Sequence, residues 1–243
     1  MKKLLFLLTL TCALAGCHFM RTNTPLPGPD PATLPQADEY YHSPQPDFVQ
    51  KKVDAFREEN KTIQPGGIVF CGDSITEGFP FDAILPDYKI ANRGIGGDSI
   101  WGLIRRLDVS AYELRPRQLF LMIAVNDIFM NKMTPPQYGE LYDYILAELQ
   151  KNCPGCKIYV QSILPVRGKI ANIEPTKLNA TIREVNRELE ADAMKRGVEF
   201  LNINPLFCDE KGEMKTEYSN DGVHPNRAGY EAWARQIKRF LKK

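Results

Sequence analysis

Histidine is scarce in this chain of 243 residues, which contains only His18, His42 and His224. The first two lie in an N-terminal stretch whose composition indicates a leader and a linker. A serine is a weak nucleophile at neutral pH unless a neighbouring imidazole accepts its proton. If the folded part of the chain carries out serine chemistry, His224 is therefore the residue that we expect to serve as the base.

Net charge is also nearly absent, because 31 Lys and Arg residues face 30 Asp and Glu residues, which leaves a formal charge of +1 at pH 7. Domains that bind nucleic acid carry a clear basic excess. We therefore expect no nucleic-acid partner. Hydrophobic residues make up 43% of the chain, an ordinary share for a globular protein with a core.

The apolar run at the N-terminus, Leu4 to Leu10, falls short of the roughly 20 residues that span a bilayer. It follows two lysines and leads to Leu14-Ala15-Gly16-Cys17, an order typical of a secretory signal. These four residues also resemble a bacterial lipobox, in which the cysteine is lipidated. We predict a lipoprotein signal peptide at residues 1–16, a lipid anchor at Cys17, and a place in the bacterial cell envelope, on the periplasmic face or the outer-membrane surface. An ordinary signal peptide with an incidental cysteine is the alternative.

Few cysteines remain beyond the leader and Cys17, and two of them form the string Cys153-Pro-Gly-Cys156. A reactive thiol in such a pair usually opens a helix, which lowers its pKa. Here the pair follows a helical stretch and precedes a strand, so the pattern favours a local disulfide that closes a turn. Free thiols, or redox or metal chemistry, are the alternatives. With no histidine nearby the pair makes a poor zinc site, and we expect no metal or organic cofactor.

Proline is concentrated in residues 18–46, which hold seven prolines. Such a stretch does not build a core and favours an extended, semi-rigid tether. We predict a tether over residues 17–46, which would hold the domain off a membrane, and one domain over residues 47–243.

Strand and helix patterns alternate through this domain. Short apolar runs predict strands at residues 68–71, 88–91, 119–125, 158–163 and 198–203, and helical spacing predicts helices at 100–107, 138–149, 178–194 and 228–241. Alternation of this kind favours an α/β fold with three layers, α/β/α, around a five-stranded parallel sheet. In open sheets of this type, ligands bind at the carboxyl ends of the strands.

Polar motifs follow several of these strands. Gly72-Asp73-Ser74 comes after the first strand, where Ser74 lies on the turn into a helix, although an Asp-Ser helix cap is the simpler interpretation. The glycine-rich run from Asn92 to Asp98 follows the second strand and lets backbone N–H groups approach an oxyanion. It lacks the Gly-Lys-Ser/Thr ending of a phosphate loop.

The third motif, Asn126-Asp127, follows the central strand and offers a side-chain amide to an oxyanion. Asp221 and His224 lie on the last loop, and their spacing in a turn lets the carboxylate fold back on the imidazole. A surface histidine is the usual interpretation of such a residue. We prefer a catalytic one here because four motifs fall at the same edge of the predicted sheet.

These four blocks, in this order, resemble the SGNH (GDSL) hydrolase superfamily over about residues 65 to 242. The serine, glycine, asparagine and histidine of that name correspond to Ser74, Gly94, Asn126 and His224. The resemblance implies the flavodoxin-like SGNH fold. It also implies a carboxylic ester hydrolase with Ser74 as nucleophile, His224 as base and Asp221 as its orienting carboxylate. The oxyanion hole would be formed by Ser74, Gly94 and Asn126.

Two details refine the resemblance. The run from Asn92 to Asp98, together with residues 161–165, looks most like the platelet-activating-factor acetylhydrolase-like branch. The third block usually reads Gly-x-Asn-Asp, but Ala124 stands in place of the glycine here. Because the asparagine is kept, we expect this change to alter specificity rather than abolish catalysis.

The expected substrate is an ester with a small acyl group, an O-acetyl group on a glycan, since an envelope lipoprotein meets acetylated polysaccharide. Lysophospholipids or longer acyl esters are the alternative substrates, and the segment from Val166 to Pro175 is a candidate cover for the site. An O-acyltransferase and a non-catalytic binding lipoprotein are the alternative functions. The sequence does not indicate the oligomeric state.

Overall fold

A computed structural model of the chain describes residues 26–35, 46–130 and 132–242. The predicted signal peptide, the predicted anchor at Cys17 and much of the predicted tether lie outside the described residues. Among the helices in the described part of the chain, none has the length and apolar character needed to cross a membrane.

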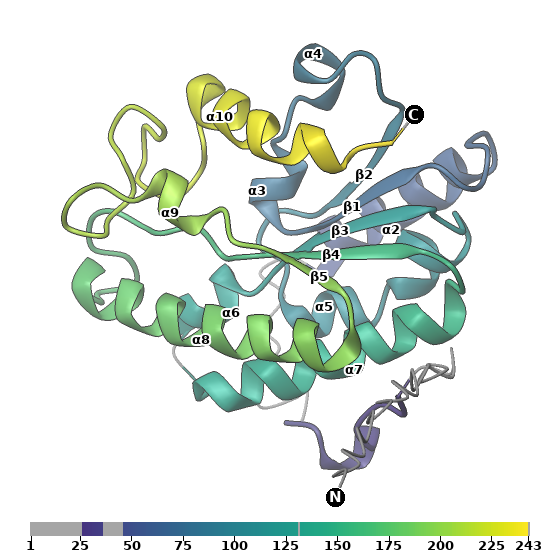
Figure 1. Cartoon of the computed structure of the whole chain (residues 1–243), viewed down its shortest axis with the longest axis horizontal. Helices are drawn as coiled ribbons and strands as arrows, with labels where there is room; N and C mark the ends of the chain where they lie inside the picture. The colour runs from purple at the N-terminus through teal and green to yellow at the C-terminus, as the bar shows by residue number, and fades with distance from the viewer. Residues whose placement is uncertain (1–25, 36–45, 131, 243) are drawn as a thin grey trace, which may run out of the picture.

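A five-stranded parallel sheet forms the centre of the molecule (Figure 1). The strand order is β2-β1-β3-β4-β5, and the bounds are β1 (Ile68–Gly72), β2 (Ile90–Gly94), β3 (Gln118–Met122), β4 (Lys157–Gln161) and β5 (Glu199–Leu201). The predicted α/β fold is confirmed. Strand β2 begins and ends later than predicted, because the Tyr88 N–H donates to the carbonyl of Leu85 and so belongs to the preceding turn.

Helices cover both faces of the sheet, as the three-layer prediction requires. The bounds of the longer helices are α2 (Pro46–Asn60), α7 (Pro135–Asn152), α8 (Pro175–Arg196) and α10 (Arg227–Ile237). Short helical segments lie between them: η1 (Pro31–Thr33), α3 (Ser74–Glu77), α4 (Phe81–Ile84), α5 (Ile100–Ile104), η2 (Asp108–Tyr112), α6 (Val125–Met130), α9 (Asn204–Phe207) and η3 (Lys238–Phe240). In Figure 1, α7 and α8 lie on one side of the sheet, and α4 and α10 on the other.

Local sequence signals set the ends of these helices. Helix α7 starts with Pro135 after Thr134, whose N–H donates to the Oε1 of Gln137 at 2.7 Å. Helix α8 ends at Gly197, whose φ of 66° is the left-handed conformation that closes many helices. These signals explain where α7 begins and where α8 ends.

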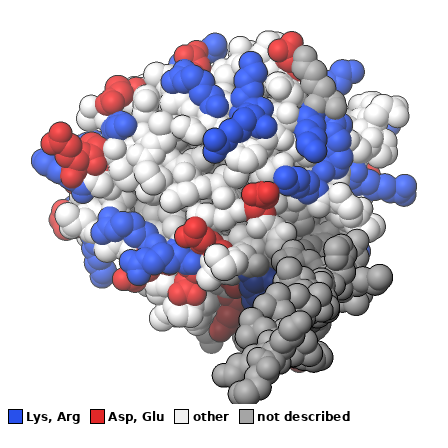
Figure 2. All heavy atoms as spheres, viewed as in Figure 1, with Lys and Arg blue, Asp and Glu red and all other residues white. Residues whose placement is uncertain are grey.

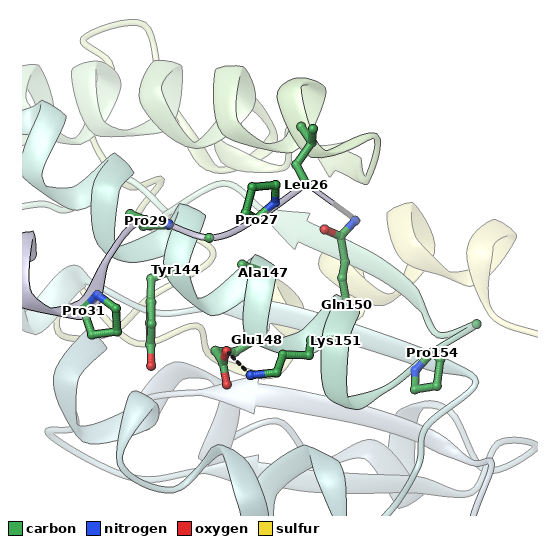
Figure 3. Close-up of a pocket in the computed structure, with 12 residues that line it drawn as sticks. Leu26, Pro27, Pro29, Pro31, Tyr144, Ala147, Glu148, Gln150, Lys151 and Pro154 are labelled. Atoms are coloured by element: carbon green, nitrogen blue, oxygen red, sulfur yellow. Dashed lines mark hydrogen bonds and ion pairs between the residues drawn. The ribbon is translucent and has the colours of Figure 1, made fainter. Parts of the chain in front are cut away.

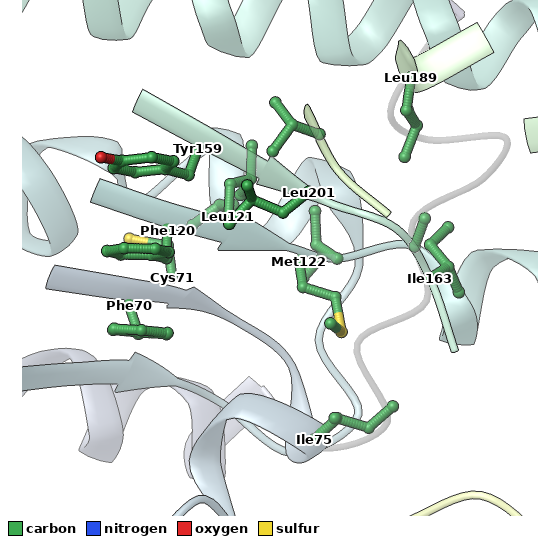
Figure 4. Packing of buried hydrophobic residues seen from close by; sticks show 14 of the residues in the cluster. Phe70, Cys71, Ile75, Phe120, Leu121, Met122, Tyr159, Ile163, Leu189 and Leu201 are labelled. Atoms are coloured by element: carbon green, nitrogen blue, oxygen red, sulfur yellow. The ribbon is translucent and has the colours of Figure 1, made fainter. Parts of the chain in front are cut away.

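The core is built on the sheet itself. Phe70, Phe120 and Tyr159 stand side by side on β1, β3 and β4, with ring centroids 4.5 and 4.4 Å apart (Figure 4). All five residues of β1 and of β3 are buried, so both strands are covered on both faces. This packing makes the sheet a rigid base for the loops at its carboxyl edge.

Residues 26–35 of the predicted tether lie against α7 and α8. The side chain of Arg196, which is fully buried, donates to the carbonyls of Leu26 at 2.9 Å and Pro27 at 3.2 Å. Leu34 belongs to the main core, with only 3% of its surface exposed. A cavity of about 670 Å³ lies between this segment and α7 (Figure 3). At least part of the predicted tether is therefore docked on the domain.

Cys153 and Cys156 are free thiols in this structure, as are Cys71 and Cys208. The favoured disulfide between Cys153 and Cys156 is therefore not present. The turn is closed instead by a hydrogen bond of 3.1 Å from the Cys156 N–H to the Cys153 carbonyl, with Gly155 at a φ of 81°. Burial raises the pKa of the Cys153 thiol to about 11 and that of the Cys156 thiol to about 12, which makes both poor nucleophiles.

The small net charge conceals an uneven surface. Figure 2 shows Lys and Arg side chains gathered on the side where Figure 1 places α10. The exposed basic residues of α10 and the segment after it are Arg227, Arg235, Lys238, Arg239 and Lys242. Since the attraction of such a surface for anions falls with added salt, activity measurements should be compared at one ionic strength.

Candidate active site

Ser74 lies at the carboxyl edge of the sheet, where β1 ends and helix α3 begins. The Oδ1 of Asp73 caps this helix by accepting the N–H of Ile75 at 3.0 Å. The capping interpretation of the motif therefore applies to Asp73, and it leaves the hydroxyl of Ser74 free for another partner. The motif supplies a cap and an accessible serine at once.

That partner is His224, which lies 150 positions further along the chain. The Ser74 Oγ and the His224 Nε2 are 2.9 Å apart, and the His224 Nδ1 lies 2.6 Å from the Asp221 Oδ2. The three predicted residues thus form a continuous chain of hydrogen bonds. His224 is 48% exposed and Asp221 56% exposed in their side chains, so the chain lies at an open rim rather than in a deep cavity.

The carboxylate of Asp221 is held in its charged form. Partial burial acts to raise its pKa, but hydrogen bonds from the His224 ring and from the N–H groups of Val223 and His224 outweigh burial and hold the pKa well below its usual value. A charged carboxylate only accepts hydrogen bonds. The His224 Nδ1 therefore carries the proton, and its Nε2 is left to accept the proton of Ser74.

Several residues that sequence reasoning missed support the histidine loop. The Ser219 Oγ lies 3.1 Å from the Asp221 Oδ1 and 2.8 Å from the carbonyl of His224, and it accepts the N–H of Gly222 at 2.9 Å. The N–H of Arg167 donates to the carbonyl of Gly222 at 2.8 Å. The segment from Val166 to Pro175, predicted as a candidate cover, therefore braces this loop at Arg167.

The side chain of Arg167 is held by residues 209–214. Its Nε donates to the carbonyl of Met214 at 2.5 Å, and its guanidinium also bonds the carboxylate of Asp209 and lies 3.3 Å from that of Glu213. Gly222 has a φ of 83°, and a Cβ atom added there would lie 2.3 Å from the carbonyl oxygen of Arg167. Backbone conformation and lack of space both require glycine between Asp221 and His224.

Helix α10 connects the histidine loop to the serine helix. It begins three residues after His224, and its Tyr230 hydroxyl donates to the carbonyl of Ile75 at 2.9 Å. Asn226 caps α10 by accepting the N–H of Gly229 at 3.1 Å. The same helix therefore limits the movement of both Ser74 and His224.

Asn126 is the second residue of α6, which begins three positions after the last residue of β3, and its Nδ2 donates to the carbonyl of Asp98 at 2.8 Å. The preceding Ala124 is buried and has a φ of 118°, a conformation that favours glycine and costs another residue about 1–3 kcal/mol. The methyl group of Ala124 thus strains the backbone at the position where the resembled family has glycine. It does not detach Asn126 from Asp98.

The predicted glycine donor requires a correction. The N–H of Gly94 already donates to the Asn92 Oδ1 at 2.9 Å, and a Cβ atom at Gly94 would lie 2.1 Å from the backbone nitrogen of Glu77. Gly94 is therefore a close-packing position whose N–H is occupied. Gly97, in a turn with a φ of 73°, has no acceptor for its N–H among the described residues. It is the available donor in the same glycine-rich run.

Two buried side chains stiffen this edge of the sheet from below. Arg106 donates to Asp98 at 2.8 Å and to the carbonyls of Gly72 and Arg93, each at 2.9 Å, so it joins the ends of β1 and β2. Burial raises the pKa of Asp73 to about 7, which keeps much of that carboxyl neutral under the serine. The sequence shows Arg106 only as an arginine in a helical stretch after the glycine-rich run. It does not show that Asp98 and the two backbone carbonyls are its partners.

No group of three or more His, Cys, Asp and Glu side chains gathers to hold a metal ion within residues 26–35, 46–130 and 132–242. The groups that do converge are a hydroxyl, an imidazole, a carboxylate, a side-chain amide and backbone N–H groups. This set can activate a serine and receive an oxyanion.

Comparison with known proteins agrees with this arrangement. A model of the GDSL-like Lipase/Acylhydrolase family matches residues 70–232. Among curated proteins, none matches the chain. A solved structure from Streptococcus pneumonia named for platelet activating factor has 29% identity and a TM-score of 0.73, with 81% of this chain and 94% of that chain covered.

Two further solved structures are similar. A GDSL-like lipase from Bacteroides thetaiotaomicron has 25% identity and a TM-score of 0.68, over 79% of this chain and 97% of its own. A catalytic mutant of an acetylxylan esterase from Geobacillus stearothermophilus has 20% identity and a TM-score of 0.56, over 73% of this chain and 94% of its own. At that identity the last likeness concerns the fold.

Proposed function

Because the chain belongs to the GDSL-like lipase/acylhydrolase family and is a carboxylic ester hydrolase, we propose that Ser74, His224 and Asp221 are its catalytic triad. The observation that carries this proposal is the unbroken chain from the Ser74 Oγ through both ring nitrogens of His224 to the Asp221 Oδ2, at 2.9 and 2.6 Å. These distances match those expected of a nucleophile, its base and the group that orients the base.

In the proposed mechanism, the His224 Nε2 takes the proton of Ser74 as the Oγ attacks the ester carbonyl. The carbonyl oxygen gains negative charge, which the N–H groups of Ser74 and Gly97 stabilise together with the second N–H of the Asn126 amide, whose first N–H donates to Asp98. Ser74 is the first residue of α3, so its N–H has no acceptor within the helix. Loss of one such donor typically costs about 2.7–4 kcal/mol of activation free energy.

Collapse of the tetrahedral intermediate expels the alcohol, which receives the proton from His224, and leaves the acyl group on Ser74. Water then attacks the acyl-enzyme with His224 again as base. Asp221 stays ionised throughout and stabilises the imidazolium, in keeping with a pKa held below its usual range.

For the substrate, we propose small O-acyl groups, acetyl above all, on a carbohydrate. The exposure of His224 and Asp221 supports this, because an open rim accommodates an ester on a large, hydrophilic alcohol. The glycine-rich run and the likeness to the Streptococcus structure support a place near the platelet-activating-factor acetylhydrolase-like branch. A lipid anchor at Cys17 in the bacterial envelope would bring the enzyme to acetylated polysaccharide.

The test is hydrolysis of p-nitrophenyl esters from acetate to octanoate by wild type and by Ser74→Ala, checked for folding by circular dichroism. We expect turnover that depends on Ser74 and is fastest with acetate, and release of acetate from an O-acetylated glycan. Turnover that rises with chain length would replace the glycan proposal by a lipid substrate. Equal rates for the wild type and Ser74→Ala would refute the triad.

A further inference from the structure

Glu77 ties the serine helix to the glycine-rich turn. It is the last residue of the one-turn helix that Ser74 begins, and its Oε2 accepts the N–H of Gly96 at 2.6 Å. A Cβ atom at Gly96 would lie 2.9 Å from that Oε2 and 3.9 Å from the Cβ of Ser74, so the turn packs directly on the helix. The hydrogen bond thus links Ser74 to the peptide next to Gly97.

The geometry gives this link a consequence for the oxyanion hole. With the N–H of Gly96 committed to Glu77 and the turn closed by the Asp98 N–H on the Ile95 carbonyl at 3.2 Å, the following N–H of Gly97 is left in a fixed orientation. Ser74 and Gly97 are the two backbone donors of the proposed mechanism. Their spacing is therefore set through the carboxylate of Glu77.

The carboxylate of Glu77 is negatively charged, and it would repel the negative charge that develops on the oxyanion. Lys52 counters it: its Nζ lies 2.5 Å from the Glu77 Oε1, with 35% of the Lys52 side chain and 27% of the Glu77 side chain exposed. Charges that are partly shielded from water interact more strongly than fully exposed ones. The pair is thus neutral where a lone Glu77 would oppose the transition state.

Lys52 belongs to α2, which lies outside residues 70–232 that match the family model. This helix is fastened to the glycine-rich run. Val53 and Phe56 pack with Ile95 in a small second core, and the guanidinium of Arg93 lies 4.6 Å from the ring centroid of Phe56. Arg93 also donates to the Glu59 Oε2 at 3.0 Å and the Asn60 Oδ1 at 2.7 Å. Helix α2 therefore holds Lys52 in place over Glu77.

We propose that Lys52 and Glu77 are positioning residues for the oxyanion hole, with Glu77 holding the Ile95–Gly96 peptide so that the next N–H, that of Gly97, is oriented, and with Lys52 neutralising Glu77. This inference rests on the proposed function of the same site. By this proposal, α2 contributes to catalysis although it precedes the residues that match the family model.

Turnover of p-nitrophenyl acetate tests the pair in the full chain. Lys52→Met should lower kcat roughly tenfold with little change in KM, by the Coulomb repulsion of an unpaired carboxylate. Glu77→Ala should lower kcat about 10- to 100-fold, because the turn loses its orientation. Glu77→Gln keeps an acceptor without the charge and should stay within about threefold of wild type. Lys51→Met, an exposed neighbour on the same helix, is the matched control.

The double variant Lys52→Met/Glu77→Gln distinguishes positioning from plain stability. We expect its kcat to return to that of Glu77→Gln, because no uncompensated charge remains. A double variant as slow as Lys52→Met, or a Lys52→Met variant as fast as Lys51→Met, would overturn the charge argument.

Hydrogen exchange at the Gly96 amide tests the contact without any substrate, so it separates this inference from the proposed function. Protection should be lost in Glu77→Ala and kept in Glu77→Gln. If wild type shows no Ser74-dependent turnover but this pattern holds, the proposed function fails and the positioning contact stands. Protection in Glu77→Ala equal to that in wild type would refute the contact.

Discussion

Gly222, between Asp221 and His224 of the proposed triad, provides the sharpest test of how the fold holds His224. Its φ of 83° strains any other residue by about 1–3 kcal/mol. A Cβ there would also lie 2.3 Å from the carbonyl oxygen and 3.0 Å from the carbonyl carbon of Arg167. Backbone atoms cannot swing aside as a flexible side chain can. Gly222→Ala must therefore displace the loop that carries His224.

Gly212→Ala is the matched control. Gly212 has a similar φ of 76°, but a Cβ there would approach only the end of the Arg183 side chain, at 3.6 Å. Both substitutions carry the conformational strain, reduced by about 0.4–1 kcal/mol because alanine also restricts the unfolded chain. Only Gly222→Ala carries the clash. The difference between the two variants isolates the effect of moving the loop.

The assay combines thermal unfolding with p-nitrophenyl acetate turnover at a temperature where both variants are folded. Both should melt below wild type, and Gly222→Ala should melt lower than Gly212→Ala. A displacement of about 1 Å can cost about 100-fold in rate, so Gly222→Ala should lose roughly that factor in kcat while Gly212→Ala keeps its rate. A folded Gly222→Ala enzyme with wild-type kcat would show that this loop does not need its present geometry.

Two further predictions concern a buried acid and the docked N-terminal segment. Burial raises the pKa of Asp73 to about 7 from an ordinary value of 3.8, so the folded state binds this proton more tightly than the unfolded state does. The stability of the wild type should therefore fall as the pH rises between these two values. The melting temperature of Asp73→Asn should rise relative to that of wild type from pH 4 to pH 8, and a constant difference would contradict the burial argument. A Cβ at Gly28 would lie 2.7 Å from the Cβ of Ala147, so Gly28→Ala should speed cleavage of residues 26–35 by proteinase K without changing turnover of a soluble ester. Adding Ala147→Gly should restore protection, and no change in either variant would mean that the segment is not held there.

The sheet and long helices could be predicted because their patterns extend over many residues. The run from Leu119 to Val125 predicted the central strand, although β3 ends at Met122, where the chain turns toward α6. The short helices α3, α4, α6 and α9 have only four to six residues each, too few to show a helical period. Strand β2 was displaced in the prediction because its polar Asn92 and Arg93 do not resemble a strand.

The residues of the proposed triad were visible because each lies in a short local motif, and the structure brings Ser74, His224 and Asp221 together as predicted. The sequence did not show which glycine of the glycine-rich run offers its N–H to the oxyanion. Gly94 and Gly97 lie three positions apart in one run, and only the Asn92 side chain and the backbone angle of Gly97 distinguish them. Glu77, Arg167 and Ser219 were missed because their partners lie on other segments or on the backbone.

Labelling with a fluorophosphonate tests the central claim most directly, because the reagent reacts with a serine only where a base and an oxyanion hole activate it. The probe should label the wild type once, and peptide mass mapping should place the adduct on Ser74. Ser74→Ala and His224→Ala should remain unlabelled while folded. An adduct on another residue, or an unlabelled wild type that hydrolyses esters, would contradict the assignment of Ser74 and His224 as nucleophile and base.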